Sequence, residues 1–244
     1  MDLVADTREI VMTDNRTALI TGASAGLGRA LTRRLVADGW QVVGTARGAD
    51  RLRGLGDELG PGFTAVAGDV TDELHRAELG RIVRERGRLD LLVNNASRLG
   101  PSPLPRLERY PLDEFRRVLD TNVVAPLDLI QIVLPELRTA QGTIIDVSSD
   151  AAVAPYEGWG GYGASKAALD QLSAVLGEET PELRFYAVDP GDMRTEMHQA
   201  AFPGEDISDR PEPETVVPAL LRLIDTRPPS GRLVAAEIGA GVPA

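Results

Sequence analysis

Short apolar runs alternate with longer helical segments along almost the whole chain, and this alternation constrains the fold more than any other feature. Parallel strands need long crossover connections, which helices usually provide, so the alternation predicts a parallel sheet covered by helices on both faces. Strands are expected at 17–20, 41–45, 63–67, 89–93, 142–148, 183–188 and 232–236, and helices at 27–38, 72–86, 112–139 and 162–178. We therefore predict an α/β fold with one doubly wound domain and a parallel sheet of about seven strands.

Two parts of the chain depart from this alternation. Residues 1–15 carry several charges and no sustained period, which predicts a flexible N-terminal extension before a single domain at 16–244. The stretch 191–213 contains three prolines and no clear period. Connections of this length are uncommon unless they are lids or disordered segments. We therefore expect a substrate lid at about 192–213.

The composition excludes several classes of protein. With a formal net charge of −11 and no cluster of Lys and Arg, the chain lacks the basic surface of a nucleic-acid binder. No apolar run approaches the ~20 residues that cross a bilayer. There is no cysteine, and His75 and His198 stand alone without metal-ligand spacing. We expect a cytoplasmic protein that binds no metal, nucleic acid or membrane, with His75 on a helix surface.

A glycine-rich turn, Thr21–Gly28, joins the first strand to the first helix. Its glycines permit a tight turn and let backbone N–H groups approach a pyrophosphate at the helix N-terminus. Many strand–helix junctions need glycine for steric reasons alone, but the position after the first strand of an alternating chain favours a dinucleotide site. The expected cofactor contacts in this turn are Gly22, Ser24, Ala25, Gly26, Leu27 and Gly28.

The turn has the pattern T-G-x-x-x-G-x-G, and further motifs follow it in order. They are Asp69-Val70, Asn94-Asn95-Ala96, Asn122, Ser148-Ser149, Tyr162-x-x-x-Lys166, and Pro190-Gly191 with Thr195. With this set the chain resembles the short-chain dehydrogenase/reductase family, of the Tyr-x-x-x-Lys type, over about 17–236. The resemblance implies a Rossmann fold, and a homodimer or homotetramer built partly on the long helices. Two positions depart from the family pattern: Ser97 replaces a usual glycine, and Ala25 replaces a basic residue frequent in NADP-preferring members.

Tyr162 and Lys166 lie four residues apart and so project from one face of a helix. A nearby ammonium group favours the phenolate, which brings a tyrosine from its ordinary pKa of about 10 toward the working range of an acid–base catalyst. The resemblance assigns proton transfer to Tyr162 and a hydrogen bond with the substrate oxygen to Ser149. Ser148 is the alternative, because adjacent strand residues point to opposite faces and only one should enter the site. A solvated helix face and a strand-end turn are the competing structural interpretations.

The resemblance makes Asn122 a fourth catalytic residue, which holds a water in a proton relay with Lys166. Pro126 has no N–H and cannot bond to the carbonyl of Asn122 within a helix, so that carbonyl is left free for water. Asp69 is expected at the adenine or, alternatively, as a helix N-cap, and Asn94 shapes the cofactor pocket or simply serves as a turn residue. The other cofactor contacts implied by the resemblance are Asp69, Val70, Asn95, Ala96, Tyr162, Lys166, Pro190, Gly191 and Thr195.

The end of the second strand bears on which nicotinamide cofactor is used. NAD-specific Rossmann sites place a carboxylate there for the ribose 2′-OH, whereas this strand ends Gly44-Thr45-Ala46-Arg47. Arg47 can pair with a 2′-phosphate through two charge-assisted hydrogen bonds, and the hydroxyls of Thr45 and Ser24 can add to them. A solvent-directed Arg47 is the alternative. We predict NADP(H) as the preferred cofactor and NAD(H) as the alternative.

These observations together predict an NAD(P)-dependent oxidoreductase that interconverts a carbonyl and a secondary alcohol by direct hydride transfer. Its partner is a small-molecule substrate, which the sequence does not identify. Two other functions stay open: a family member that uses the redox step transiently, as epimerases and dehydratases do, and a non-catalytic cofactor-binding sensor. The sensor hypothesis is disfavoured by the presence of Tyr162 and Lys166 together, and a purely structural role would require the glycine-rich turn to be incidental.

Overall fold

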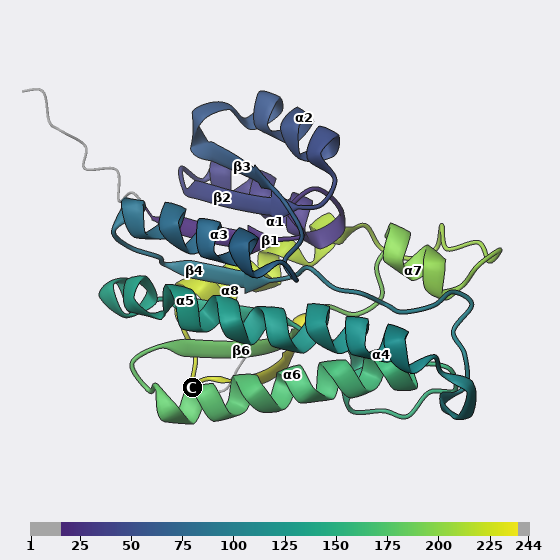
Figure 1. Ribbon diagram of the computed structural model, residues 1–244. Helices are drawn as coiled ribbons and strands as arrows, with labels where there is room; N and C mark the ends of the chain where they lie inside the picture. The colour runs from purple at the N-terminus through teal and green to yellow at the C-terminus, as the bar shows by residue number, and fades with distance from the viewer. Residues whose placement is uncertain (1–15, 239–244) are drawn as a thin grey trace, which may run out of the picture.

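Seven parallel strands form one sheet at the centre of the molecule, in the order β3-β2-β1-β4-β5-β6-β7 (Figure 1). The computed structural model describes residues 16–238, so the predicted extension at 1–15 lies outside the described residues. The prediction of a doubly wound parallel sheet is confirmed. The strands are β1 Thr17–Thr21, β2 Gln41–Ala46, β3 Phe63–Ala67, β4 Leu91–Asn94, β5 Thr143–Val147, β6 Arg184–Asp189 and β7 Gly231–Val234.

Helices cover both faces of this sheet because successive strand residues point to opposite sides. Ala18 and Ile20 of β1 pack with α1, α2 and α8, whereas Leu19 between them packs with α3, α5 and α6 (Figure 1). Burial on both faces explains why the central strands are nearly continuous apolar runs. The helices are α1 Gly26–Ala37, α2 Ala49–Leu59, α3 Glu73–Arg86, α4 Leu112–Leu119, α5 Ala125–Ala140, α6 Gly160–Glu179, α7 Glu196–Ala201 and α8 Val217–Thr226.

Three of these helices were missing from the prediction. Only Leu52 and Leu55 of α2 are buried, so its sequence carries a weak apolar stripe. The ten-residue α8 has a proline in its first turn, which obscured its period. The third, α7, lies inside 192–213, so the expectation of an irregular segment there is wrong in part. Thr195 caps α7 by accepting a hydrogen bond from the backbone N–H of His198 (3.1 Å).

The predicted continuous helix over 112–139 is wrong at its centre. Residues Asp120–Val124 form a π-helical turn, in which the N–H of Ala125 bonds to the carbonyl of Asp120, five residues earlier. Pro126 follows directly and cannot donate to an ordinary helical ladder, and π turns of this kind often occur at functional sites. The wide turn places Asn122 in the interior with no exposed surface.

The 29-residue helical run Leu112–Ala140 contains an 18-residue window with a mean hydropathy of 1.4, which by length and composition alone is apolar enough to cross a membrane. In the structure 39% of its most apolar window is buried. Leu129, Val133 and Leu137 belong to the core between α5 and the sheet. The run is therefore composed like the core helix of a globular domain.

The strand order reverses between β1 and β4, and α/β sheets bind their ligands beside such a switch point, at the carboxyl ends of the strands. Segments that follow β1, β2, β3, β4, β5 and β6 line one cavity of about 920 Å³ at this edge. The fold thus brings distant parts of the sequence into one site.

Candidate active site

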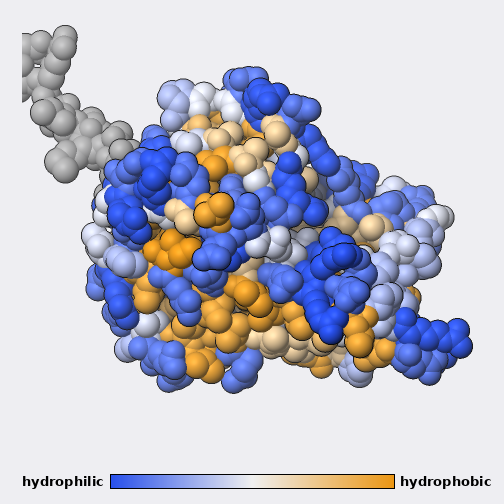
Figure 2. Space-filling model, viewed as in Figure 1, coloured by the Kyte–Doolittle hydropathy of each residue, from blue (hydrophilic) through white to orange (hydrophobic). Residues whose placement is uncertain are grey.

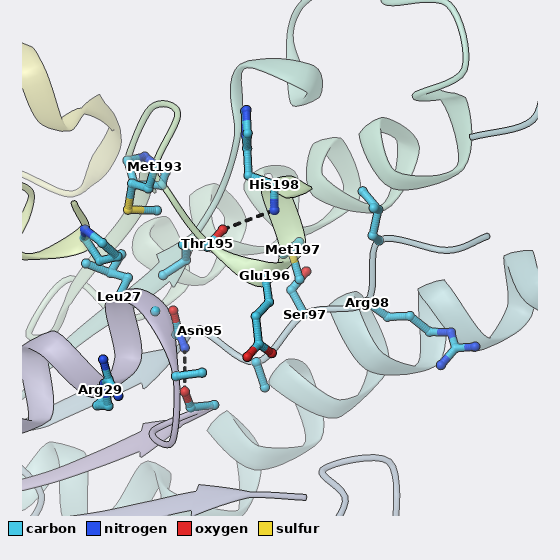
Figure 3. A pocket seen from close by; sticks show the side chains of 18 of the residues that line it. Leu27, Arg29, Asn95, Ser97, Arg98, Met193, Thr195, Glu196, Met197 and His198 are labelled. Carbon is cyan, nitrogen blue, oxygen red and sulfur yellow. Dashed lines mark hydrogen bonds between the residues drawn. The ribbon is translucent and has the colours of Figure 1, made fainter. Parts of the chain in front are cut away.

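The cavity contains most of the predicted site residues (Figure 3). Four of the predicted residues do not line it: Gly28, Thr45, Asn122 and Asn94, whose amide is buried and donates to Asp146 (2.8 Å). Those that line it are Gly22, Ser24, Ala25, Gly26, Leu27, Arg47, Asp69, Val70, Asn95, Ala96, Ser149, Tyr162, Lys166, Pro190, Gly191 and Thr195. The structure therefore brings the two predicted sets, catalytic and cofactor-binding, to one place.

The glycine-rich turn is tightly packed against the end of β4. A Cβ at Gly28 would lie 2.4 Å from the carbonyl oxygen of Gly22, and Gly22 itself has a φ of +68°. The amide of Asn95 donates to the carbonyls of Thr21 (2.9 Å) and Gly22 (3.3 Å). Only glycine fits at these points, and Asn95 holds the turn in a shape that an extended phosphate-bearing ligand can lie against.

At the end of β2, Arg47 is exposed and lines the cavity. Within residues 16–238 Arg47 forms no ion pair, although its charge lowers the pKa of Asp69, whereas Arg51, four residues further along the chain, pairs with Glu196 of α7 (2.7 Å). The expected hydroxyl contact from Thr45 is wrong. Thr45 is fully buried, and its Oγ1 shares a 2.7 Å hydrogen bond with Nε2 of His75.

His75 is also placed differently from the prediction of a surface residue. It is half-buried beneath the loop after β3, where a Cβ at Gly68 would lie 2.2 Å from its Nδ1. Burial lowers the pKa of His75. The negative charges of nearby carboxylates act in the opposite direction but do not cancel this effect. His75 is thus a neutral side chain that supports the loop carrying Asp69.

The alternative interpretation of Asp69 as a helix N-cap is not borne out, because Asp72 caps α3 by accepting from Leu74 N–H (2.9 Å). Asp69 instead accepts from the N–H and the hydroxyl of Thr71, both at 2.9 Å. Burial raises the pKa of Asp69, but these hydrogen bonds lower it, and the net shift is downward. The carboxylate is therefore ionised at the cavity wall.

Tyr162 and Lys166 both project from α6 toward the end of β5. The Nζ of Lys166, whose side chain is 1% exposed, donates to the carbonyl of Val147 (2.6 Å) and lies 5.5 Å from the centroid of the Tyr162 ring. Ser149 follows β5 and lines the cavity; its Oγ donates to Asp150 (3.0 Å) and accepts from Ala151 N–H (3.1 Å). Ser149 thus caps the short 3-10 helix Asp150–Ala152 and also lines the cavity.

The other serine, Ser148, borders the cavity as well, so the expectation that only one of the pair would reach it is not met. Its hydroxyl oxygen is nevertheless buried, and only 2% of the residue is exposed. Ser149 is the more accessible of the two.

The predicted effect of Lys166 on the tyrosine is not found. Burial raises the pKa of Tyr162 to about 12; a hydrogen bond with Ser97 opposes this, and the charges of Asp189 and Asp150 add to it. Burial likewise lowers the pKa of Lys166 to about 8, against the attraction of Asp146 and Asp170. Both groups are desolvated, and desolvation favours the neutral form of each.

Asn122 has a side chain whose hydrogen-bonding capacity is fully used. Its Oδ1 accepts from Arg98 N–H (2.7 Å) and from Ser97 Oγ (3.1 Å), and its Nδ2 donates to the carbonyl of Arg98 (3.0 Å) and to Ser165 Oγ (2.9 Å). Ser165 in turn donates to the carbonyl of Tyr162 (2.6 Å). Through these bonds Asn122 connects the loop after β4 to the helix that carries the tyrosine.

Sequence reasoning missed a positioning residue, Arg232 of β7. Its guanidinium bonds to Asp170 on α6 (3.0 Å), to the carbonyl of Ser149 after β5 (3.0 Å) and to Asp189 at the end of β6 (3.2 Å). A single side chain therefore holds three elements of the site together. The only signal in the sequence was Asp170, which lies four residues after Lys166 and so on the same helix face.

The sequence and the fold of this chain are similar to those of known dehydrogenases. The chain is 40% identical to the serine 3-dehydrogenase of Rhizobium radiobacter over 74% of this chain and 73% of that one. It is 34% identical to an NADP-dependent 3-hydroxy acid dehydrogenase of Escherichia coli, over 77% of each. A short-chain dehydrogenase from Shigella flexneri, complexed with NADP, superposes with a TM-score of 0.84 at 29% identity, over 91% of this chain and 97% of that one. The family model described as short chain dehydrogenase matches residues 16–206, and the chain belongs to this family of NAD(P)-dependent oxidoreductases.

Proposed function

We propose that this protein is an NADP(H)-preferring oxidoreductase that interconverts a carbonyl compound and a secondary alcohol. The observation that carries the proposal is the shared cavity, where the glycine-rich turn, Ser149, Tyr162 and Lys166 meet at the carboxyl edge of the sheet. Family membership supports the reaction class. The close approach of Gly22 and Gly28 supports a fit to a dinucleotide, since side chains there would collide with the turn itself.

In this proposal the bound cofactor supplies or accepts the hydride, and the residues of the chain handle the oxygen and the proton. The hydroxyl of Ser149 donates to the substrate oxygen. Tyr162 gives its proton to that oxygen in reduction and takes it back in oxidation. Lys166 holds the ribose, and Asn122 provides the connection to solvent through its backbone carbonyl.

The preference for NADP(H) over the alternative NAD(H) rests on the end of β2. In the described part of the chain Arg47 forms no ion pair, although its charge lowers the pKa of Asp69, and Ala46 before it leaves no carboxylate at the strand end to repel a 2′-phosphate. The names of the relatives and the bound NADP of the Shigella flexneri structure point the same way. Ala25 provides no second basic residue, so Arg47 carries the preference.

The proposal also covers place and assembly: a cytoplasmic enzyme that is a homodimer or homotetramer. Apolar side chains gather on the outer face of α5 and α6 (Figure 2). Val124, directly before α5, and Val175 of α6 are exposed, at 52% and 41%. Exposed apolar surface on two long neighbouring helices is typical of an interface. The segment 192–213 is proposed as the lid over the substrate, with α7 as its ordered part.

The decisive test is oxidation of NADPH by carbonyl compounds with purified wild type and Tyr162→Phe. The variant keeps the ring and its packing but has no proton to transfer, so we expect NADPH binding to persist and kcat to fall about 10²–10⁴-fold. Binding is followed by the fluorescence of NADPH. Near-full turnover in Tyr162→Phe would contradict the assignment of the tyrosine, and absence of NADPH binding in wild type would contradict the proposed function.

A further inference from the structure

The wall of the cavity nearest Tyr162 is apolar. Leu99, Trp159 and Met197 line the cavity and pack in one cluster with Tyr162. The ring of Trp159 meets the ring of Tyr162 edge to face, with centroids 5.8 Å apart. These side chains come from the loop after β4, the start of α6 and α7, so a group attached to a carbonyl carbon near Tyr162 would lie among apolar atoms.

The cations at this end of the cavity are already engaged. Arg98 pairs with Glu114 of α4 (2.7 Å), and its guanidinium points away from the cavity (Figure 3). Nε2 of His198 accepts a hydrogen bond from Arg210 (3.4 Å), and its Nδ1 lies 3.7 Å from a carboxylate oxygen of Asp192. Lys166 is buried against Val147. None of these cations is arranged to receive a carboxylate from a substrate.

The acidic side chain of Asp150, next to Ser149, differs from these cations because no opposite charge pairs with it in the described residues. Asp150 accepts hydrogen bonds from the hydroxyls of Ser149 (3.0 Å) and Tyr156 (2.9 Å), and in the described part of the chain it has no cationic partner. It lines the cavity. Its negative charge acts at the reactive oxygen, because together with Asp189 it raises the pKa of Tyr162. A substrate carboxylate in this region would meet repulsion without compensation.

We propose that the substrate is a neutral carbonyl compound with an apolar or aromatic group, and that the site discriminates against carboxylates. This inference rests on the proposed function and narrows it. It separates the chain from relatives named for serine and for 3-hydroxy acids, whose substrates carry a carboxylate. Leu99, Trp159 and Met197 contact the apolar group of the substrate, and the negative charge of Asp150 repels a carboxylate.

The test compares keto acids with their methyl esters, which differ mainly in charge. Three pairs are assayed with NADPH: benzoylformate, 2-oxooctanoate and 4-oxopentanoate, each with its ester. We expect kcat/KM for the esters to exceed that for the acids by about 10²-fold, the size of effect that an uncompensated charge produces at short range. Equal or greater turnover of the acids would overturn the inference. Reduction of none of the six compounds would contradict the proposed function instead.

A charge introduced on α7 tests the same point within the protein. Met197→Arg adds a cation to the wall, and Met197→Gln is its neutral control of similar length. We expect the acid-to-ester ratio of kcat/KM to be about tenfold higher in Met197→Arg than in Met197→Gln, since a cation at this distance attracts a carboxylate only. An unchanged ratio would show that the substrate does not lie against this wall and would overturn the inference.

Discussion

Among single residues, Arg47 is the one that we propose distinguishes NADPH from NADH. Its guanidinium follows β2 with no ion pair in residues 16–238, next to a strand end that carries no carboxylate. A charge-assisted pair of hydrogen bonds with a phosphate contributes about 1.5–3 kcal/mol, so we expect Arg47→Ala to lower the NADPH-to-NADH ratio of kcat/KM by about 10–100-fold. The measurement is the NADPH-to-NADH ratio of kcat/KM in wild type and in Arg47→Ala.

Ala46→Asp is the control that adds a charge instead of removing one. Its carboxylate should repel the 2′-phosphate and so also lower this ratio. A wild type that prefers NADH would refute the assignment.

Among the elements, β7 acts on the site through Arg232. Replacing it by Met leaves the charges of Asp170 and Asp189 without their cation, and the charge of Asp189 already raises the pKa of Tyr162. Alcohol oxidation needs the deprotonated tyrosine, so its activity rises with pH through the tyrosine pKa. In Arg232→Met we therefore expect this rise to move to higher pH by at least about 0.5 units, the direction that an uncompensated negative charge gives.

The matched variant for this prediction is Arg232→Lys, which keeps the charge but cannot bond to three groups at once. Its pH profile should stay close to that of wild type, with a lower kcat because Ser149 is held less well. Thermal unfolding of both variants separates loss of the fold from loss of positioning. Equal pH profiles in Arg232→Met and wild type would argue against an electrostatic role for Arg232.

In the whole molecule, the proposed association with a second copy rests on the exposed apolar face of α5 and α6. Ala167 is exposed on α6. Ala167→Arg would place a charge in the contact, and we expect it to shift a dimer or tetramer toward smaller species in sedimentation velocity. Ala37→Arg, an exposed position on α1 at the opposite face of the sheet, is the control and should leave the assembly intact. A monomeric wild type at micromolar concentration would contradict the proposed assembly.

The sequence sufficed for features that depend on local patterns. The buried strands are continuous apolar runs, the Gly22–Gly28 turn needs its glycines in place, and Tyr162 and Lys166 share a helix face by spacing alone. Features that depend on tertiary contacts were not predictable. The π turn at 120–124 accompanies the bonds of Asn122 to segments distant in the chain, and Arg232 lies 62 residues from the aspartate it bonds to. Likewise, only the fold could show that the hydroxyl of Thr45 forms a hydrogen bond with His75 and does not face the cofactor site.

The ion pair between Arg51 and Glu196 links the two ends of the cavity energetically. Arg51 stands one helical turn from Arg47, so an anion bound between them competes with Glu196 of α7 for the same guanidinium. By thermodynamic reciprocity, an anion bound there would weaken the contact between α2 and α7 by as much as that contact weakens the binding of the anion. Both side chains are largely exposed, at 59% and 77%, and such pairs contribute at most about 1 kcal/mol. The resulting cooperativity between anion binding and the α2–α7 contact would be negative and limited to about fivefold.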